Sequence, residues 1–128
     1  MVNFRLMTRI NLGRSGEDAA CQYLTKLGYQ IVERNFRCRM GEIDIIARDD
    51  QTLVFVEVKT RASIACGQPF EAVHYFKQRK LIKLAEFYLK RCFQTTCIAC
   101  RFDVVSILHS GSGPDIRHLK NAFICNWI

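Results

Sequence analysis

The sequence predicts an α/β domain, built as a mixed β-sheet with helices on both faces and with its elements in the order α-β-β-β-α-β. Three observations lead to this fold class. The chain has 128 residues, 49% of them hydrophobic, which suits one core. Two segments carry apolar residues at helical spacing, and several runs of β-branched and aromatic residues lie between turn residues. The runs expected as strands are residues 29–36, 42–48, 53–60 and 101–108.

We expect a single domain over residues 1–128, with residues 1–12 as a candidate flexible arm. The first helix is expected over residues 16–27, because Ser15 can cap it with Asp18 at the third position and Gly28 can end it. Its apolar face would consist of Ala20, Tyr23, Leu24 and Leu27. Residues 29–36 then alternate as a strand.

Residues 42–48 and 53–60 predict an antiparallel hairpin, because the turn residues Asp49 to Thr52 separate them. If the loop is these four residues or the central pair, Arg48 lies opposite Leu53 and Ile46 opposite Phe55. The same register sets Asp44 against Glu57 and Glu42 against Lys59. The flanking residues are so apolar that both faces of these strands are expected to be buried.

Two opposed acids are unfavourable in a hairpin, since directly opposite residues hold their Cβ atoms about 5 Å apart. At an effective dielectric near 20, two unit charges at that distance repel by roughly 3 kcal/mol, and a divalent cation between them reverses the sign. Asp44 and Glu57 therefore predict a cation site. The alternative is a solvated hairpin in which the acids point into water and Glu42 forms an ordinary salt bridge with Lys59.

The second half of the chain predicts a long helix and another strand. Pro69 would open the helix, which runs to about Arg91. Its apolar residues at helical spacing are Leu81, Leu84, Ala85, Tyr88 and Leu89. Residues 101–108 form the strand, residues 110–114 a turn, and the tail adds a short strand or a helical turn.

Charge and cysteine content restrict the class of protein. Nineteen Lys and Arg against twelve Asp and Glu give a net charge of +7, which favours a polyanionic partner such as nucleic acid or an anionic membrane surface. A protein that is basic without such a partner is the alternative. Arg5 and Arg9 interrupt the apolar N-terminus, so we expect no membrane span and a cytoplasmic protein. Seven cysteines, an odd number scattered through core segments, fit reduced thiols.

The acids and the lysine beside them belong to a wider pattern. The chain resembles the YraN family of small bacterial proteins, within the PD-(D/E)xK nuclease superfamily, from about residue 11 to 123. The blocks that carry the resemblance are Gly41-Glu42-Ile43-Asp44, Phe55-Val56-Glu57-Val58-Lys59-Thr60-Arg61, Gly13-Arg14-Ser15-Gly16-Glu17-Asp18-Ala19-Ala20, Gly28-Tyr29, Arg34-Asn35, Gly67-Gln68-Pro69, Lys77, Arg101-Phe102-Asp103-Val104-Val105 and Asn121-Ala122-Phe123. The resemblance implies a restriction-endonuclease-like fold.

The resemblance also implies a metal-dependent endonuclease that acts on branched or single-stranded DNA in repair or recombination. Asp44 and Glu57 would bind Mg²⁺ or Mn²⁺, and the backbone carbonyl of Val58 would complete the metal shell. Lys59 would orient the attacking water or stabilise the phosphate. Glu17 would reach the metal through water, although an acid in the first turn of a helix also simply complements the helix dipole.

Candidate DNA contacts come from several elements. The expected phosphate contacts are Lys77, Arg61, Gln68, Arg14 and Lys80. The basic residues among them that lie on the long helix could instead form an ordinary solvated face. A non-catalytic module that docks on nucleic acid or on a repair partner is the alternative function. Junction-cutting relatives are symmetric dimers, so a homodimer is expected by analogy only.

One cysteine spacing suggests a different site. Cys92, Cys97 and Cys100 follow a C-x4-C-x2-C pattern, and Cys125 is available as a fourth ligand. This spacing resembles that of plant-type iron–sulfur proteins. The alternative, which the sequence favours, is a helix end that runs into a strand, with no metal bound.

Overall fold

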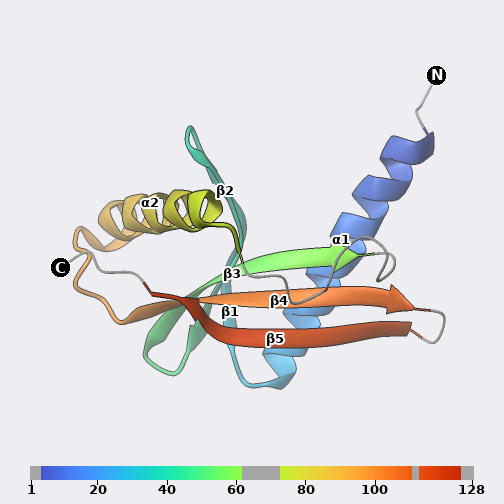
Figure 1. The fold of residues 1–128 in the computed structure, drawn as a ribbon. Helices are drawn as coiled ribbons and strands as arrows, with labels where there is room; N and C mark the ends of the chain where they lie inside the picture. Colours follow the sequence, from blue (N-terminus) through green and yellow to red (C-terminus); the bar gives the residue numbers. More distant parts are fainter. Residues whose placement is uncertain (1–3, 62–72, 111–112, 125–128) are drawn as a thin grey trace.

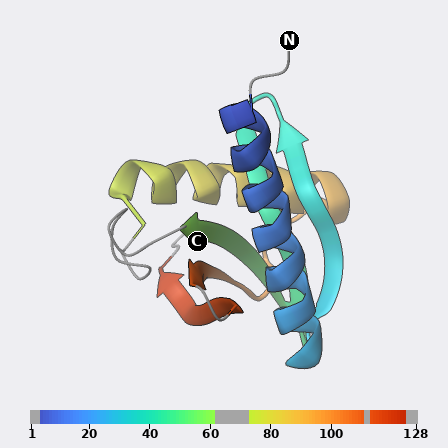
Figure 2. The same cartoon turned by 90° about the vertical axis from the view of Figure 1, so that its right-hand side faces the viewer.

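The protein is a five-stranded sheet with one helix packed on each face, as seen in a computed structural model that describes residues 4–61, 73–110 and 113–124 (Figures 1 and 2). The side chains of residues 4–14 and 110 are not described. In chain order the elements are α1 (Phe4–Lys26), β1 (Gln30–Cys38), β2 (Gly41–Asp49), β3 (Thr52–Arg61), α2 (Tyr75–Phe93), β4 (Cys100–Ser110) and β5 (Gly113–Phe123). The α/β class predicted from the sequence is confirmed.

The strands lie side by side in their order along the chain, from β1 to β5. Neighbouring strands are antiparallel except β3 and β4, which are parallel. A parallel pair needs a long crossover, and α2 belongs to that crossover between β3 and β4. Because α1 covers the opposite face, the middle of the sheet is shielded from water on both sides.

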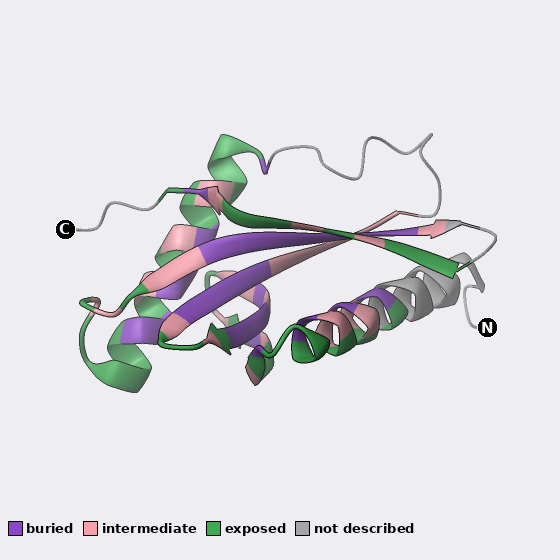
Figure 3. Ribbon diagram, turned by 90° about the horizontal axis from the view of Figure 1, so that it is seen from below, coloured by how far each residue is buried: buried purple, intermediate pink, exposed green. Residues whose placement is uncertain are grey.

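Consecutive residues 53–56 of β3 are all buried, so both faces of this part of the strand are covered, as the apolar sequence predicted. Figure 3 shows such buried stretches along the ribbon. Leu53 and Phe55 belong to the hydrophobic cluster on the α2 side of the sheet. Val54 and Val56, which alternate with them, belong to the cluster on the α1 side. The helix residues that complete these clusters are Leu81, Leu84, Ala85, Tyr88 and Leu89 from α2 and Ala20 and Leu24 from α1. The predicted apolar face of the second helix is therefore confirmed.

The predicted register of the hairpin is correct for Arg48 with Leu53 and for Ile46 with Phe55. The last paired residues toward the open end are Ile45 and Val56, so the predicted pairs of Asp44 with Glu57 and of Glu42 with Lys59 are not part of the ladder. Glu42 forms a salt bridge with Arg37 of β1 at 2.8 Å. Ile43 packs in the α2-side cluster while Ile45 packs in the α1-side cluster, although residues two apart on a regular strand share a face. Strand β2 therefore bends and twists around Asp44, where it separates from β3.

The first helix begins at Phe4, so the predicted start at Gly16 is wrong. Ser15 and Gly16 lie inside α1 and do not cap it, and helical backbone includes most of the stretch suggested as an arm. Gly16 serves close packing instead, because a Cβ there would lie 2.1 Å from Oγ1 of Thr60 on β3. The predicted end is correct, since Gly28 adopts a φ of +95° just beyond the helix. Leu27 lies outside the helix and is exposed, contrary to its predicted place on the apolar face.

The second half of the chain departs from prediction at two points. Helix α2 begins at Tyr75, whereas Pro69, its predicted start, lies outside the described residues. The tail forms β5, an eleven-residue strand paired with β4, where only a short strand or turn was expected. Edge strand β5 is mostly exposed, so its sequence shows little hydrophobic alternation. No helix in the described part of the chain has the length and apolar character needed to cross a membrane.

Candidate metal-binding and catalytic site

Asp44 and Glu57 meet where β2 separates from β3, as the hairpin register predicted. Beyond the last paired residues of β2 and β3, the backbone N–H of Val58 donates to Oδ2 of Asp44 at 2.8 Å. The carboxyl groups of Asp44 and Glu57 are close enough that each affects the pKa of the other. A shared proton or a cation would relieve the repulsion between their charged forms.

Two further acids lie next to Asp44. Carboxylate oxygens of Glu17, Glu42 and Asp44 all lie within 4.8 Å of one another. Glu17 comes from the middle of α1, not from the opening turn of a helix as predicted, so the helix-dipole explanation for this residue no longer applies. The close approach of α1 to β3 at Gly16 carries Glu17 to the acids of the hairpin.

Asn35 connects two of these acids, and sequence reasoning did not identify this role. In the amide orientation that satisfies both groups, its side-chain nitrogen donates to Glu42 at 2.9 Å and to Glu17 at 3.2 Å. Asn35 has a φ of +54°, a left-handed conformation that asparagine tolerates better than most residues. The Arg34-Asn35 pair within the family-like blocks was the available signal.

The surroundings favour the uncharged forms of the central acids. Burial raises the pKa of Asp44 to about 7, and the charge of Glu57 adds to the rise, while the Val58 N–H opposes it. Burial also raises the pKa of Glu57, although Lys77 and Lys59 act in the opposite direction. Each of the other acids has a basic side chain beside it: Arg34 lies 3.9 Å from Glu17, Arg37 2.8 Å from Glu42 and Lys77 3.6 Å from Glu57. Asp44 accepts a hydrogen bond from the Val58 N–H, and a cation beside it would favour its charged form.

Two lysines lie on the other side of Glu57. Nζ of Lys77, in the first turn of α2, lies 3.6 Å from Oε1 of Glu57. Lys59 is two residues beyond Glu57 on β3, so both side chains project from the same face of that strand. Both lysines and Glu57 line a pocket of about 390 Å³. Its other lining residues are Val58, Thr60, Arg61, Val73 and His74.

The backbone of Val58 also faces Asp44. The N–H and the carbonyl of one residue in an extended strand point to the same side. Since the Val58 N–H points to Asp44, the Val58 carbonyl is directed to that side as well. This is the orientation that the predicted metal ligand requires.

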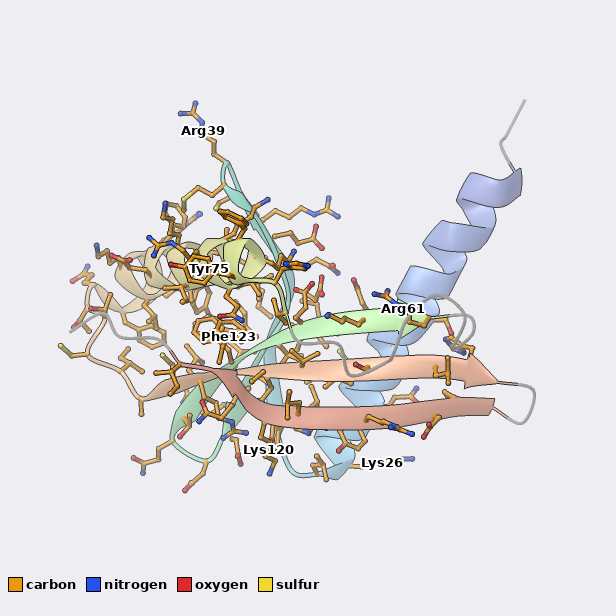
Figure 4. The ribbon with its side chains drawn as sticks, viewed as in Figure 1. Lys26, Arg39, Arg61, Tyr75, Lys120 and Phe123 are labelled. Carbon is orange, nitrogen blue, oxygen red and sulfur yellow. The ribbon has the colours of Figure 1, made fainter. Side chains whose placement is uncertain are left out.

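The predicted phosphate contacts separate into three groups. Lys77 and Arg61 line the pocket beside Glu57, and Arg61 lies near the end of β3 (Figure 4). Lys80 instead lines a different pocket, next to Gly41 and Met40. Gln68 lies outside the described residues, and the side chain of Arg14 is not described.

The cysteine pattern does not assemble into a metal site in the described part of the chain. Cys92, Cys97 and Cys100 are free thiols there, and no group of three potential ligands within reach of one ion includes them. Cys125 lies outside the described residues. Among those described, the group formed by Glu17, Glu42 and Asp44 is the one with metal-ligand spacing, and it does not include Glu57, the predicted second ligand.

Comparison with other proteins identifies close relatives of the chain. Residues 16–107 match the model of the uncharacterised protein family UPF0102. A UPF0102 protein of Geobacter metallireducens is 54% identical over 113 residues, which cover 88% of this chain and 92% of the relative. One of Caldicellulosiruptor saccharolyticus is 47% identical over 119 residues, which cover 91% of this chain and the whole relative. The residue blocks noted in the sequence and these matches agree: the chain belongs to the UPF0102 family.

Proposed function

We propose that the protein is a metal-dependent endonuclease that acts on branched or single-stranded DNA. The observation that carries the proposal is the contact between Asp44 and Glu57, two largely buried acids whose pKa values are both raised. Packing alone would disfavour such a pair. The PD-(D/E)xK resemblance supports the same reading, because it assigns metal binding to these two positions. We further propose a cytoplasmic protein that works in repair or recombination.

The residues present fit a hard divalent cation. Mg²⁺ and Mn²⁺ prefer oxygen ligands, and the site offers the carboxylates of Asp44 and Glu57 together with the Val58 carbonyl side of β3. Glu17 and Glu42 lie beside Asp44, where they would bind water molecules of the cation. When bound, such a cation polarises the scissile phosphate and lowers the pKa of a coordinated water.

The protein's own residues supply the remaining chemistry. Lys59 projects beside Glu57 into the pocket, where its ammonium group would orient the attacking water or hold a phosphate oxygen. Lys77, which is paired with Glu57, would pair with a phosphate instead once a cation neutralises that acid. Arg61 at the pocket edge would contact the DNA backbone.

The test is an incubation of labelled duplex, flap, four-way-junction and single-stranded oligonucleotides with the protein and Mg²⁺ or Mn²⁺. We expect strand cleavage that is lost in Asp44→Ala and Glu57→Ala, with thermal unfolding showing that both variants fold. Glu86→Ala is the matched control, because this acid on α2 pairs with a lysine at 2.8 Å but lies outside the site.

Two results would redirect the proposal. If the protein binds DNA but no metal or variant changes strand integrity, it is a docking module that has kept the fold. If Glu86→Ala and Glu57→Ala behave alike, the acids of the hairpin have no special part. Sedimentation of the active species would test whether a homodimer is the working form.

A further inference from the structure

A second surface lies at the start of α2, next to the turn between β1 and β2, and the proposed reaction does not use it. It surrounds a pocket of about 500 Å³, and we call it the aromatic–basic surface. Its lining residues are Met40, Tyr75, Phe76, Arg79, Lys80 and Lys83. Phe76 is 83% exposed and Tyr75 61%, far more than aromatic side chains usually are in a folded protein. Exposed aromatic residues gathered at one place indicate a binding surface.

The charges of this surface all have one sign. Three cations line the pocket, and none of its described lining residues is an acid. Arg79 lies over the ring of Tyr75, 5.7 Å from its centre, and donates a hydrogen bond to the Tyr75 hydroxyl at 3.1 Å. Arg39 extends from the turn between β1 and β2 (Figure 4). An occupant with several negative charges fits this arrangement.

Two aromatic side chains at the start of α2 lie one helical turn from basic side chains, which suits one kind of polyanion. Phe76 is three or four residues from Arg79 and Lys80, so these side chains are neighbours on one helix face. In single-stranded nucleic acid both phosphates and base faces are accessible, and bases stack on exposed rings. A duplex presents phosphates and base edges but few free base faces, because its bases are stacked on one another. We infer that the aromatic–basic surface binds single-stranded nucleic acid, with an unpaired base on Phe76.

The surface is continuous with the candidate site. Lys80 lies one helical turn from Lys77, which contacts Glu57. On its other side Lys80 lies against the hairpin, since a Cβ on Gly41 would be 2.8 Å from Cε of Lys80. A strand held on Phe76 would therefore lead past Lys80 to the pocket beside Glu57. The inference rests on the proposed function in one respect: it makes an unpaired strand next to the cleaved bond part of the substrate.

The experiment measures binding apart from cleavage. Fluorescence anisotropy with labelled oligodeoxythymidine and with a blunt duplex, both in EDTA, compares wild type with Phe76→Ala. We expect the variant to lose about 5- to 150-fold in affinity for the single strand, since one stacked base contributes about 1–3 kcal/mol, and to keep its duplex affinity within about twofold. Phe93→Ala is the matched control, because it removes a partly exposed phenylalanine at the other end of α2.

A second pair of variants tests the cations. Lys83→Ala should reduce the salt dependence of single-strand binding by roughly 0.7 in the log–log slope, the value for one phosphate contact. Lys90→Ala, which removes a lysine paired with Glu86, should leave the slope unchanged. Thermal unfolding of each variant checks that the fold is intact.

The outcomes separate this inference from the nuclease proposal. Single-strand binding that depends on Phe76, without cleavage in any metal, supports the surface and overturns the nuclease. Cleavage that depends on Glu57, with equal single-strand affinity in wild type and Phe76→Ala, overturns the surface and supports the nuclease. Concentration-dependent self-association lost in Phe76→Ala, with DNA affinity unchanged, would show that the surface binds a second copy of the chain and overturn the inference.

Discussion

Two acids on the same sheet, Asp103 and Asp44, differ in how their charges are balanced. Asp103 on β4 is 1% exposed and has a donor for each of its oxygens. Arg101 Nε donates to Oδ1 at 3.0 Å, His118 Nε2 lies 2.7 Å from Oδ2, and the backbone N–H of Asn121 donates at 3.0 Å. Arg101 also binds Asp49 at 2.9 Å and the hydroxyl of Tyr29.

Burial alone would raise the pKa of Asp103, but His118, Arg101 and the Asn121 N–H outweigh it and lower the pKa below its usual value. At Asp44 the balance is reversed. One backbone N–H faces three neighbouring acids, and the pKa rises to about 7. The difference shows that burial alone does not decide the charge state of an acid. Asp103 has hydrogen-bond donors that stabilise its charged form. Asp44 has one backbone donor and three acids nearby, a setting in which a cation would stabilise its charged form.

The largest expected effect on stability comes from removing the carboxyl group of Asp103. Asp103→Ala should destabilise the protein by about 3–5 kcal/mol, because Arg101 is then left largely buried without its main partner. Urea unfolding at pH 7 measures the change. A loss below about 1 kcal/mol would show that Asp49 alone compensates Arg101.

A smaller effect on stability, of opposite sign, is expected when the charge of Asp44 is removed. Asp44→Asn should stabilise the metal-free protein at pH 8 by about 1–3 kcal/mol, part of the roughly 4 kcal/mol that a rise of three pKa units represents. The asparagine oxygen can still accept the Val58 N–H. Asp50→Asn, in the exposed turn of the same hairpin, is the control. Destabilisation at pH 8 would contradict the idea that burial and the neighbouring acids disfavour the charged form of Asp44.

The pH dependence of this variant sharpens the comparison. Because the folded pKa of Asp44 is raised, its contribution to stability is fully present below about pH 4 and is lost as the pH rises toward 7. The advantage of Asp44→Asn should therefore appear above about pH 4 and grow up to about pH 7. The contribution of Asp103, whose pKa is lowered, is present above about pH 4 and lost on further acidification.

The smallest expected effect concerns the ion pair between Lys77 and Glu57. Lys77→Met should raise the pKa of Glu57 further, because Lys77 is the strongest influence that lowers it. The stability change should stay below about 1 kcal/mol, since the lysine is 44% exposed and the pair is partly screened by water. NMR titration of the Glu57 carboxyl carbon measures the pKa. An unchanged value, as expected for the control Lys90→Met, would mean that the pair does not form in solution.

Local patterns predicted the hairpin, its register and the apolar face of α2, because these depend on neighbouring residues and simple periodicity. The register in turn placed Asp44 beside Glu57. The start of α1 was mistaken because Ser15 and Gly16 resemble a cap, whereas Gly16 is needed for contact with Thr60, more than forty positions along the chain. Strand β5 was underestimated because most of its residues are exposed, so its sequence carries little of the hydrophobic alternation that marks a half-buried strand.

By itself, the sequence determined which acids could serve a cation and which strands are covered on both faces, since side-chain type and spacing are local properties. Only the tertiary structure decided that Asn35 and Glu42 join Asp44, that Glu17 does so from the middle of α1, and that Asp103 receives His118 from β5 and Arg101 from its own strand. The physical reason is that the charge state of a buried acid depends on every donor and acid around it. Those neighbours come from segments that only the packing of α1 and the pairing of β4 with β5 bring together.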